Sequence, residues 1–167
     1  MKLYIIGAGK YGKEIEDVAE QMKCYEAIYF LDDNALGVVG KCRDFVQFVS
    51  EDSVFYVAFG NNELRAKWLD EIKRVKGNLA TIIHPSAYIS PKAKVGLGVA
   101  ILPKAIVNTY SSIHDGVMVN SGAIVDHDCE IGACAHICVG AIVKADNKIP
   151  EGMKVEAGVV IERDTFK

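Results

Sequence analysis

Residues 113–143 read IHDGVMVNSGAIVDHDCEIGACAHICVGAIV, with an isoleucine or valine at every sixth position. The same spacing extends in both directions and covers residues 83–161. The isoleucines and valines stand at 83, 89, 95, 101, 107, 113, 119, 125, 131, 137, 143, 149, 155 and 161. An unbroken internal repeat of this kind indicates stacked units that share one continuous core. The repeat predicts a parallel β-helix built from six-residue edges.

Four residues after most of these branched residues stands a small one. The set is Ala87, Ala93, Val99, Ala105, Ser111, Val117, Ala123, Cys129, Ala135 and Ala141. Three hexads make one triangular coil, so residues eighteen apart stack and both sets fill the interior. We therefore interpret Cys129 as a core residue. The repeat degenerates at Asn147, Pro150 and Met153. Apolar residues on the outside of the coils, Ile106, Met118 and Ile124, favour self-association.

Residues 2–80 have a different pattern, which alternates strands with helices. Short apolar runs at 3–6, 27–31 and 54–59 predict strands, and 14–22 and 63–76 have helical spacing, with Asn62 as the expected N-cap. This pattern predicts a small α/β parallel-sheet domain of Rossmann-like type over 1–80, followed by the β-helix domain over 81–167. Parallel sheets bind ligands at the carboxyl ends of their strands.

The composition narrows the class of protein. A net charge of −3 and a pI near 5.8 provide no basic surface for nucleic acid. The apolar runs are too short for membrane insertion, and no signal peptide opens the chain, so we expect a cytoplasmic protein. Five cysteines, an odd number, indicate reduced thiols rather than a disulfide framework.

Five segments in order resemble one family. They are GAGKYGKE at 7–14, FLDDN at 30–34, FGNNELR at 59–65, IHPSA at 83–87 and VDHDC at 125–129. Together they resemble the bacterial sugar O- and N-acyltransferases, which include sialic acid O-acetyltransferases and the acetyltransferase acting on a UDP-4-amino-sugar. The resemblance implies a left-handed β-helix, a homotrimer, acetyl-CoA bound between neighbouring helices, and a nucleotide-sugar held by the N-terminal domain.

A catalytic centre is predicted around His127. Acyl transfer needs a base and a donor that stabilises the oxyanion, and His127 lies between two carboxylates. The resemblance implies that Asp126 orients His127 and that Asn120 lies near the reacting centre. It also implies coenzyme contacts at three further positions, which are His136, Gly140 and Ala145. Ala145 stacks one coil beyond His127, where the family has a glycine whose N–H reaches the thioester carbonyl.

A nucleotide site is predicted at the carboxyl edge of the N-terminal sheet. The spacing Gly7-x-Gly9-x-x-Gly12 follows a strand and opens a helix, so that amide groups can face a pyrophosphate. The other residues expected to bind the substrate are Lys10, Tyr11, Asp32, Asp33, Gly60 and Asn61. Where the family usually has Gly-His-Gly, this chain has Lys10-Tyr11-Gly12. Lys10 can attract phosphate, but Tyr11 cannot reproduce the protonation of a histidine.

Two other functions are compatible with a β-helix of this kind. A catalytic zinc site of three histidines is disfavoured, because His114, His127 and His136 are separated by 13 and 9 residues and occupy different hexad positions. A non-catalytic nucleotide-sugar-binding or scaffold protein is the second alternative, since the family commonly runs some two coils longer and this chain would then have a truncated coenzyme groove. The sequence leaves open whether nitrogen or oxygen is acylated, and which sugar is used.

Overall fold

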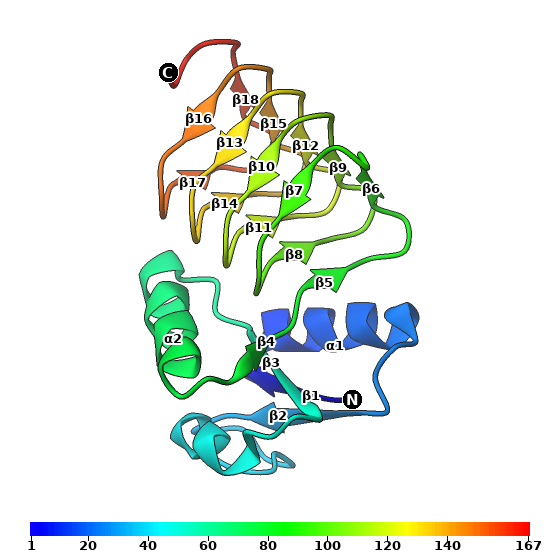
Figure 1. The fold of residues 1–167 in the computed structure, drawn as a ribbon, viewed down its shortest axis with the longest axis vertical. Coiled ribbons are helices and arrows are strands. Elements are labelled where there is room, and N and C mark those ends of the chain that lie inside the picture. The colour runs from blue at the N-terminus through cyan, green and yellow to red at the C-terminus, as the bar shows by residue number, and fades with distance from the viewer.

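The computed structural model describes all 167 residues and contains a small parallel sheet on which a β-helix stands (Figure 1). The sheet has the strand order β2-β1-β3-β4, and every pair is parallel. Its elements are β1 (Lys2–Ile6), α1 (Lys10–Met22), β2 (Ala27–Leu31), the 3-10 helix η1 (Cys42–Phe48), β3 (Ser53–Val57), α2 (Asn62–Arg74) and β4 (Asn78–Leu79). None of the helices combines the length and apolar character needed to cross a membrane.

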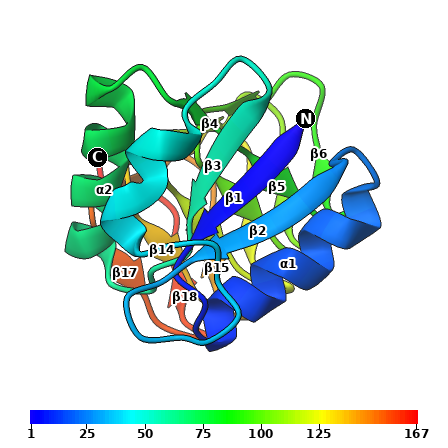
Figure 2. The same ribbon diagram turned by 90° about the horizontal axis from the view of Figure 1, so that it is seen from below.

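The central strand β1 is apolar on both faces, as expected for a sheet that is covered on both sides. Leu3 and Ile5 pack in a cluster with α1, whereas Tyr4 and Ile6 pack in a second cluster with η1 and α2. Figure 2 shows α1 and α2 on opposite sides of the sheet. The alternation of side chains along one strand thus holds two layers in place.

Both α-helices begin at other residues than those predicted. The helix expected at 14–22 begins at Lys10, directly after the glycine loop. The cap of α2 is Asn61 and not Asn62, because the Oδ1 atom of Asn61 accepts the N–H of Leu64 at 2.8 Å. Within this helix Leu64 is 40% exposed, whereas Arg65 is completely buried.

Fourteen two-residue strands form the three faces of the β-helix. The "docking sheet" contains β5 (Ile82–Ile83), β8 (Ala100–Ile101), β11 (Met118–Val119), β14 (His136–Ile137) and β17 (Lys154–Val155). The "apolar sheet" contains β6 (Tyr88–Ile89), β9 (Ile106–Val107), β12 (Ile124–Val125), β15 (Ile142–Val143) and β18 (Val160–Ile161). The "polar sheet" contains β7 (Lys94–Val95), β10 (Ser112–Ile113), β13 (Glu130–Ile131) and β16 (Lys148–Ile149).

Residues eighteen apart pair in register in all three sheets, for example Val119 with Ile137 and Val125 with Val143. The second residue of each strand points inward, and these branched side chains form the core together with the small residues. Cys129 belongs to this core, as predicted. The degenerate end is closed by the buried Asn147, whose Nδ2 donates to the carbonyls of Lys144 and Glu162 and whose Oδ1 accepts from the N–H of Phe166.

The docking sheet faces the N-terminal part of the same chain. Its outward residues Ile82, Ala100 and Leu102 share a cluster with α1 and β1. Met118 also lies on this sheet and is only 2% exposed. The prediction that self-association covers Met118 is therefore wrong, because the chain covers this residue itself. The apolar sheet has no such cover.

Candidate active site

The loops after β1 and β2 meet at the carboxyl edge of the N-terminal sheet. Gly7 has φ +104°, a conformation that favours glycine, and a Cβ atom on Gly12 would lie 2.1 Å from the carbonyl oxygen of Gly7. Asp32 accepts the N–H of Ala8 at 2.8 Å. That bond and those from the amides of Asn34 and Ala35 lower the pKa of Asp32. The structure thus brings the glycine loop and Asp32 together.

The other predicted residues of this edge have diverse roles. Lys10 is exposed. The Tyr11 hydroxyl lies 2.6 Å from that of Tyr56, and burial, followed by the interaction with Tyr56, raises the pKa of Tyr11 well above its usual value. Asp33 accepts a hydrogen bond from the N–H of Cys42 at 3.1 Å, so its carboxylate is already bound to the first residue of η1. At this edge Tyr11 therefore packs against the core, whereas the Lys10 side chain is exposed to solvent.

The loop after β3 faces the β-helix across a polar pocket of about 380 Å³. Its lining residues are Gly60, Asn61, Asn62, Glu63, Gly152 and Lys154. The Asn61 side chain is used as the helix cap, so its amide oxygen is not free for a ligand. The Nδ2 atom of Asn62 donates to the Gly152 carbonyl at 2.9 Å and ties this loop to a coil. Lys154 provides the only cation of the pocket.

His127 lies at the corner that connects β12 of the apolar sheet to β13 of the polar sheet. Its Nδ1 is 2.8 Å from the Oδ2 atom of Asp128, and this hydrogen bond raises the pKa of the imidazole. The family resemblance implied Asp126 as the orienting carboxylate. In this structure the Oδ1 of Asp126 instead accepts the N–H of His127 and the Nδ2 of Asn108. Asp128, with φ +56°, is the residue that contacts the ring.

Two further residues predicted to contact the coenzyme lie on corners of the β-helix. Ala145 stacks eighteen residues beyond His127 at the same corner, and its amide N–H donates to no group of the chain. Gly140 has φ +64° and lies on the exposed corner between the docking and apolar sheets, where its N–H donates to the Ser121 carbonyl. The two residues are thus on different corners.

His136 and Asn120 are neighbours on the docking sheet. The Nδ2 of Asn120 lies 3.4 Å from the Nε2 of His136, whereas the Nδ1 of His136 is buried without a partner. Burial, followed by the charge of Arg65, lowers the pKa of His136 to about 4. The imidazole is therefore neutral at physiological pH, and an amide that can only donate to Nε2 leaves the proton on Nδ1.

The two halves of the predicted site are not together within one chain. The corner with His127 lies on the far side of the β-helix from the N-terminal sheet (Figure 1), whereas His136 and Asn120 face that sheet. His114, His127 and His136 do not converge, and no group of three or more histidine, cysteine, aspartate or glutamate side chains is arranged to hold a metal ion.

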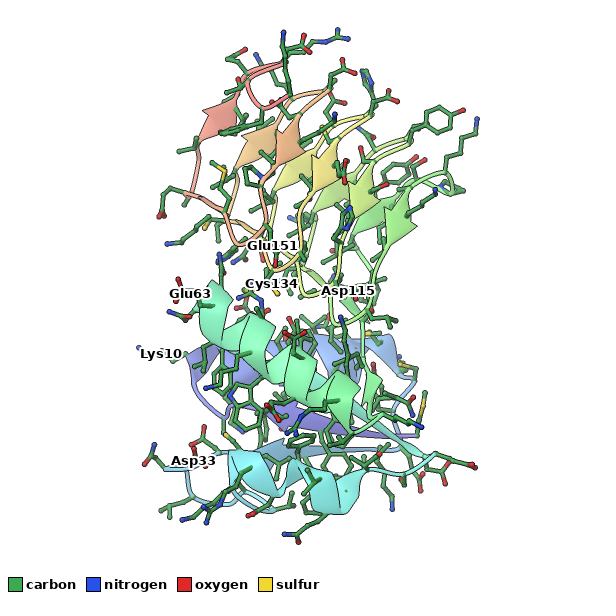
Figure 3. The ribbon with its side chains drawn as sticks, turned by 60° about the vertical axis from the view of Figure 1, so that its left-hand side comes forward. Lys10, Asp33, Glu63, Asp115, Cys134 and Glu151 are labelled. Atoms are coloured by element: carbon green, nitrogen blue, oxygen red, sulfur yellow. The ribbon has the colours of Figure 1, made fainter.

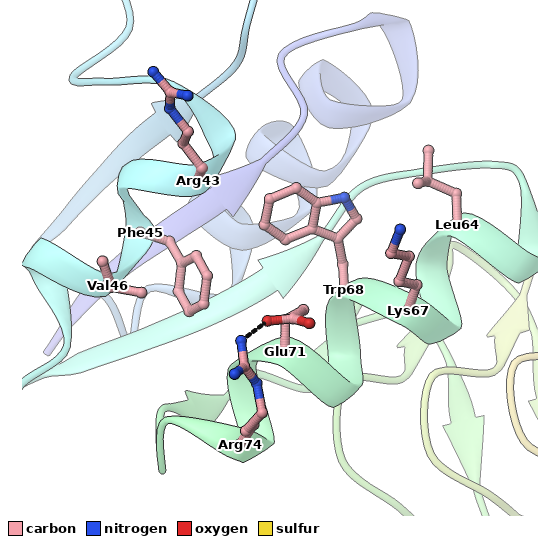
Figure 4. Close-up of a pocket in the computed structure, with 8 residues that line it drawn as sticks. All are labelled: Arg43, Phe45, Val46, Leu64, Lys67, Trp68, Glu71 and Arg74. Atoms are coloured by element: carbon pink, nitrogen blue, oxygen red, sulfur yellow. Dashed lines mark hydrogen bonds and ion pairs between the residues drawn. The ribbon is translucent and has the colours of Figure 1, made fainter.

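An apolar pocket of about 310 Å³ lies away from these residues, between η1 and α2 (Figure 4). It is lined by Arg43, Phe45, Val46, Leu64, Lys67, Trp68, Glu71 and Arg74. None of the predicted site residues contributes to it. The sequence reasoning did not single out Arg65, Tyr56 or Asp128 for the roles that they have here. Asp128 carried a sequence signal as the second carboxylate beside His127, and Arg65 is the last residue of the segment at 59–65 that resembles the family.

Comparison with known proteins connects these features to a family. Residues 2–72 match the model of the PglD N-terminal domain. The chain is 28% identical to the UDP-N-acetylbacillosamine N-acetyltransferase of Bacillus subtilis (strain 168) over 107 residues, which cover 59% of this chain and 50% of that protein. The matched region thus spans about half the length of this curated relative.

Solved structures match over nearly the whole chain. The acetyltransferase domain of PglB from Neisseria gonorrhoeae FA1090 is 33% identical, with a TM-score of 0.87 over 98% of this chain and 92% of that one. PerB from Caulobacter crescentus, solved in complex with CoA and GDP-perosamine, is 31% identical, with a TM-score of 0.82 over 98% and 90%. The predicted fold class, a Rossmann-like parallel sheet followed by a left-handed β-helix, is confirmed.

The same comparison bears on the expectation of missing coils. The PglB domain has also been solved in complex with acetyl coenzyme A, and the match covers 97% of this chain and 91% of that one. This chain thus corresponds to nearly all of a relative that was solved with the coenzyme. On these matches, the chain belongs to the family of bacterial sugar O- and N-acyltransferases, with the PglB and PerB proteins among its relatives.

Proposed function

We propose that the protein transfers the acetyl group of acetyl-CoA to an amino group of a nucleotide-linked sugar. The observation that carries this proposal is the His127–Asp128 pair, an exposed imidazole whose Nδ1 is held at 2.8 Å from a carboxylate. The carboxylate accepts a hydrogen bond from Nδ1–H, so Nε2 keeps the lone pair that a general base requires. The choice of an amine is supported by the relatives, which are named as N-acetyltransferases.

His127 acts in both halves of the reaction. Its Nε2 takes a proton as the sugar nitrogen attacks the thioester carbonyl, and the same proton then goes to the thiolate that leaves as coenzyme A. Negative charge develops on the carbonyl oxygen in between, and a fixed N–H donor stabilises it. The amide of Ala145 is suited to this role, because it lies one coil beyond His127 and makes no hydrogen bond within the chain.

The sugar nucleotide is proposed to bind at the carboxyl edge of the N-terminal sheet. Amide groups at the start of α1 and the exposed Lys10 favour the diphosphate. Asp32 holds the loop in place by accepting three hydrogen bonds from backbone amides. The bond from Ala8 joins the two residues that lie farthest apart in sequence. The polar pocket beside Gly60 extends this edge toward the β-helix and gives room for the sugar.

We also propose that the working form is a homotrimer in which one chain supplies the edge and its neighbour supplies His127. The apolar sheet supports this, because its outward column is unpartnered within the chain. The column consists of Tyr88, Ile106, Ile124, Ile142 and Val160, and Tyr88 at its end is 54% exposed. A neighbour packed on this sheet would lie beside the corner that carries His127.

Release of free thiol from acetyl-CoA, assayed against UDP- and GDP-linked amino sugars, tests the activity. We expect turnover with at least one amino sugar and none with its hydroxyl counterpart. Absence of turnover with every acceptor, together with no heat on titration of millimolar acetyl-CoA into the folded protein, would overturn the enzyme proposal. It would favour the non-catalytic scaffold instead.

Mixed assemblies test the shared site. Lys10→Glu damages only the edge and His127→Ala only the corner, so each variant alone should be nearly inactive. If a site combines two chains, random one-to-one assembly restores about a quarter of the sites, since each half is intact with a probability of about one half. Activity that stays at the level of the separate variants would show that each site lies within one chain.

A further inference from the structure

Arg65 is a completely buried cation at the junction between α2 and the β-helix. No carboxylate pairs with it. Its Nε donates to the Gly116 carbonyl at 2.8 Å and its Nη1 to the Phe59 carbonyl at 2.9 Å, while Nη2 donates to the Cys134 carbonyl at 2.7 Å. Nη2 also donates to the Oδ1 atom of Asn62 at 2.8 Å. Burying a charge is costly unless hydrogen bonds satisfy it, so a site with this many acceptors is specific for the planar fork of an arginine.

The acceptors of Arg65 come from both parts of the molecule. Phe59 precedes the loop at the carboxyl edge of the N-terminal sheet, whereas Gly116 and Cys134 are stacked corners eighteen residues apart in the β-helix. Asn62 extends the series, because it binds the carbonyl of the next corner, Gly152. The first turn of α2 therefore holds three successive coils, and Figure 3 shows the turns with Cys134 and Glu151 facing this helix. Arg65 fixes how the edge sits against the docking sheet.

The docking sheet presents His136 to the same junction. The residue is 9% exposed, the Nε2 of its ring faces the Asn120 amide, and its Nδ1 has no partner within the chain. The charged groups that act on it are Arg65 from α2 and, from the next coil, Lys154 and Glu156, which pair with each other at 3.0 Å. Arg65 is thus the one unpaired charge among them.

We propose that Arg65 is a positioning residue of the transfer site, which holds the nucleotide-binding edge against the docking sheet through its four hydrogen bonds to the two parts of the molecule. The inference rests on the proposed function only for the identity of the ligand. The geometric part, an unpaired guanidinium that connects the edge to the coil that carries His136, stands on the contacts alone.

Two substitutions separate the charge of Arg65 from its shape. Arg65→Gln removes the cation, and Arg65→Lys keeps a cation without the fork that reaches both coil corners. Lys73→Gln is the matched control, because Lys73 lies on the same helix and makes an exposed ion pair across the same junction, with Asp115 at 2.9 Å. The state of His136 is followed by ¹⁵N NMR, and the two Michaelis constants by steady-state kinetics.

In the Arg65→Gln variant we expect His136 to titrate at higher pH than in the wild type, and kcat/KM for the sugar nucleotide to fall about tenfold or more, as for other residues that orient a site. Arg65→Lys should leave the titration of His136 near that of the wild type and raise KM for the sugar nucleotide, with KM for acetyl-CoA unchanged. Lys73→Gln should alter neither quantity.

An unchanged titration of His136 in Arg65→Gln, with kinetic losses no larger than those of Lys73→Gln, would overturn the proposal. If Arg65→Gln does not fold, Arg65→Lys decides, because kinetic constants equal to those of the wild type in that variant would contradict the proposal. The NMR measurements need no turnover. A protein that acetylates no acceptor but whose His136 responds to Arg65 would fail the proposed function and leave the coupling intact.

Discussion

Two histidines nine residues apart in the same solenoid have opposite environments. His127 projects from a corner, where a hydrogen bond to Asp128 raises the pKa of its imidazole. His136 lies on the docking sheet under the N-terminal part of the chain, where burial and then Arg65 lower its pKa to about 4. The β-helix supplies the same backbone to both residues. What differs is the face, and with it the chemistry that the side chain can perform.

The two environments suit the two histidines to separate tasks. A base must hold a lone pair and accept a proton near neutral pH, which suits the exposed imidazole of His127 with a carboxylate behind it. A fixed donor must stay neutral and keep its tautomer, which suits the buried His136 with the Asn120 amide on Nε2. One chain thus places the two histidines on different sides of a triangular prism, and in the proposed trimer a neighbouring copy would bring them together.

Removal of the base should produce the largest effect. His127→Ala is expected to lower kcat by about two to four powers of ten, the usual range for a positioned base. The melting temperature should change little, because the side chain is 47% exposed. His114→Ala is the matched control, since His114 is also exposed and also bonded to a carboxylate, that of Glu130. Equal losses in both variants, or full activity in His127→Ala, would remove the assignment.

The buried histidine should instead affect stability, and only in acid. Its pKa of about 4 in the folded protein lies below the ordinary 6.5, so the unfolded chain takes up a proton first as the pH falls. Stability is therefore lost between about pH 6.5 and pH 4, by about 3 kcal/mol at most, and is not lost further below that range. Urea unfolding of the wild type and of His136→Gln at fixed protein concentration measures this difference. A parallel decline in the two proteins would contradict it.

Much of the fold follows directly from the sequence. Branched residues at every sixth position fill the interior of a triangular coil, and no other regular structure has that period. The glycine loop was equally predictable, because Gly12 must lack a side chain for α1 to pack against Gly7. Both patterns are local, so neighbouring residues carry the whole signal.

The residues that the sequence could not place depend on distant partners or on a choice between two neighbouring carboxylates. Arg65 resembles any polar helix residue, since its carbonyl partners at Gly116 and Cys134 lie 51 and 69 residues away in sequence. Met118 was expected on an open face because the part of the chain that covers it lies far away in sequence. At His127 two carboxylates flank the imidazole, and the left-handed φ of Asp128 is associated with the contact to the ring. The left-handed angle itself recurs at every sixth residue from Gly98 to Asp164 and follows the repeat, but the repeat does not show which of the two carboxylates contacts the ring.

The smallest predicted effect distinguishes those two carboxylates. Asp128→Asn removes the charge that the ring contacts, so the pKa of His127 should fall toward its ordinary value. The acid limb of kcat/KM reports this pKa in the free enzyme and should move to lower pH, with about a tenfold or smaller loss of rate on the plateau. Asp126→Asn is the control. The Asp126 carboxylate binds an amide and Asn108 rather than the ring, and its weaker, charge-only influence on His127 should give a smaller shift. A larger shift in Asp126→Asn would mean that, in the working assembly, the base exchanges Asp128 for the carboxylate that the family resemblance implied.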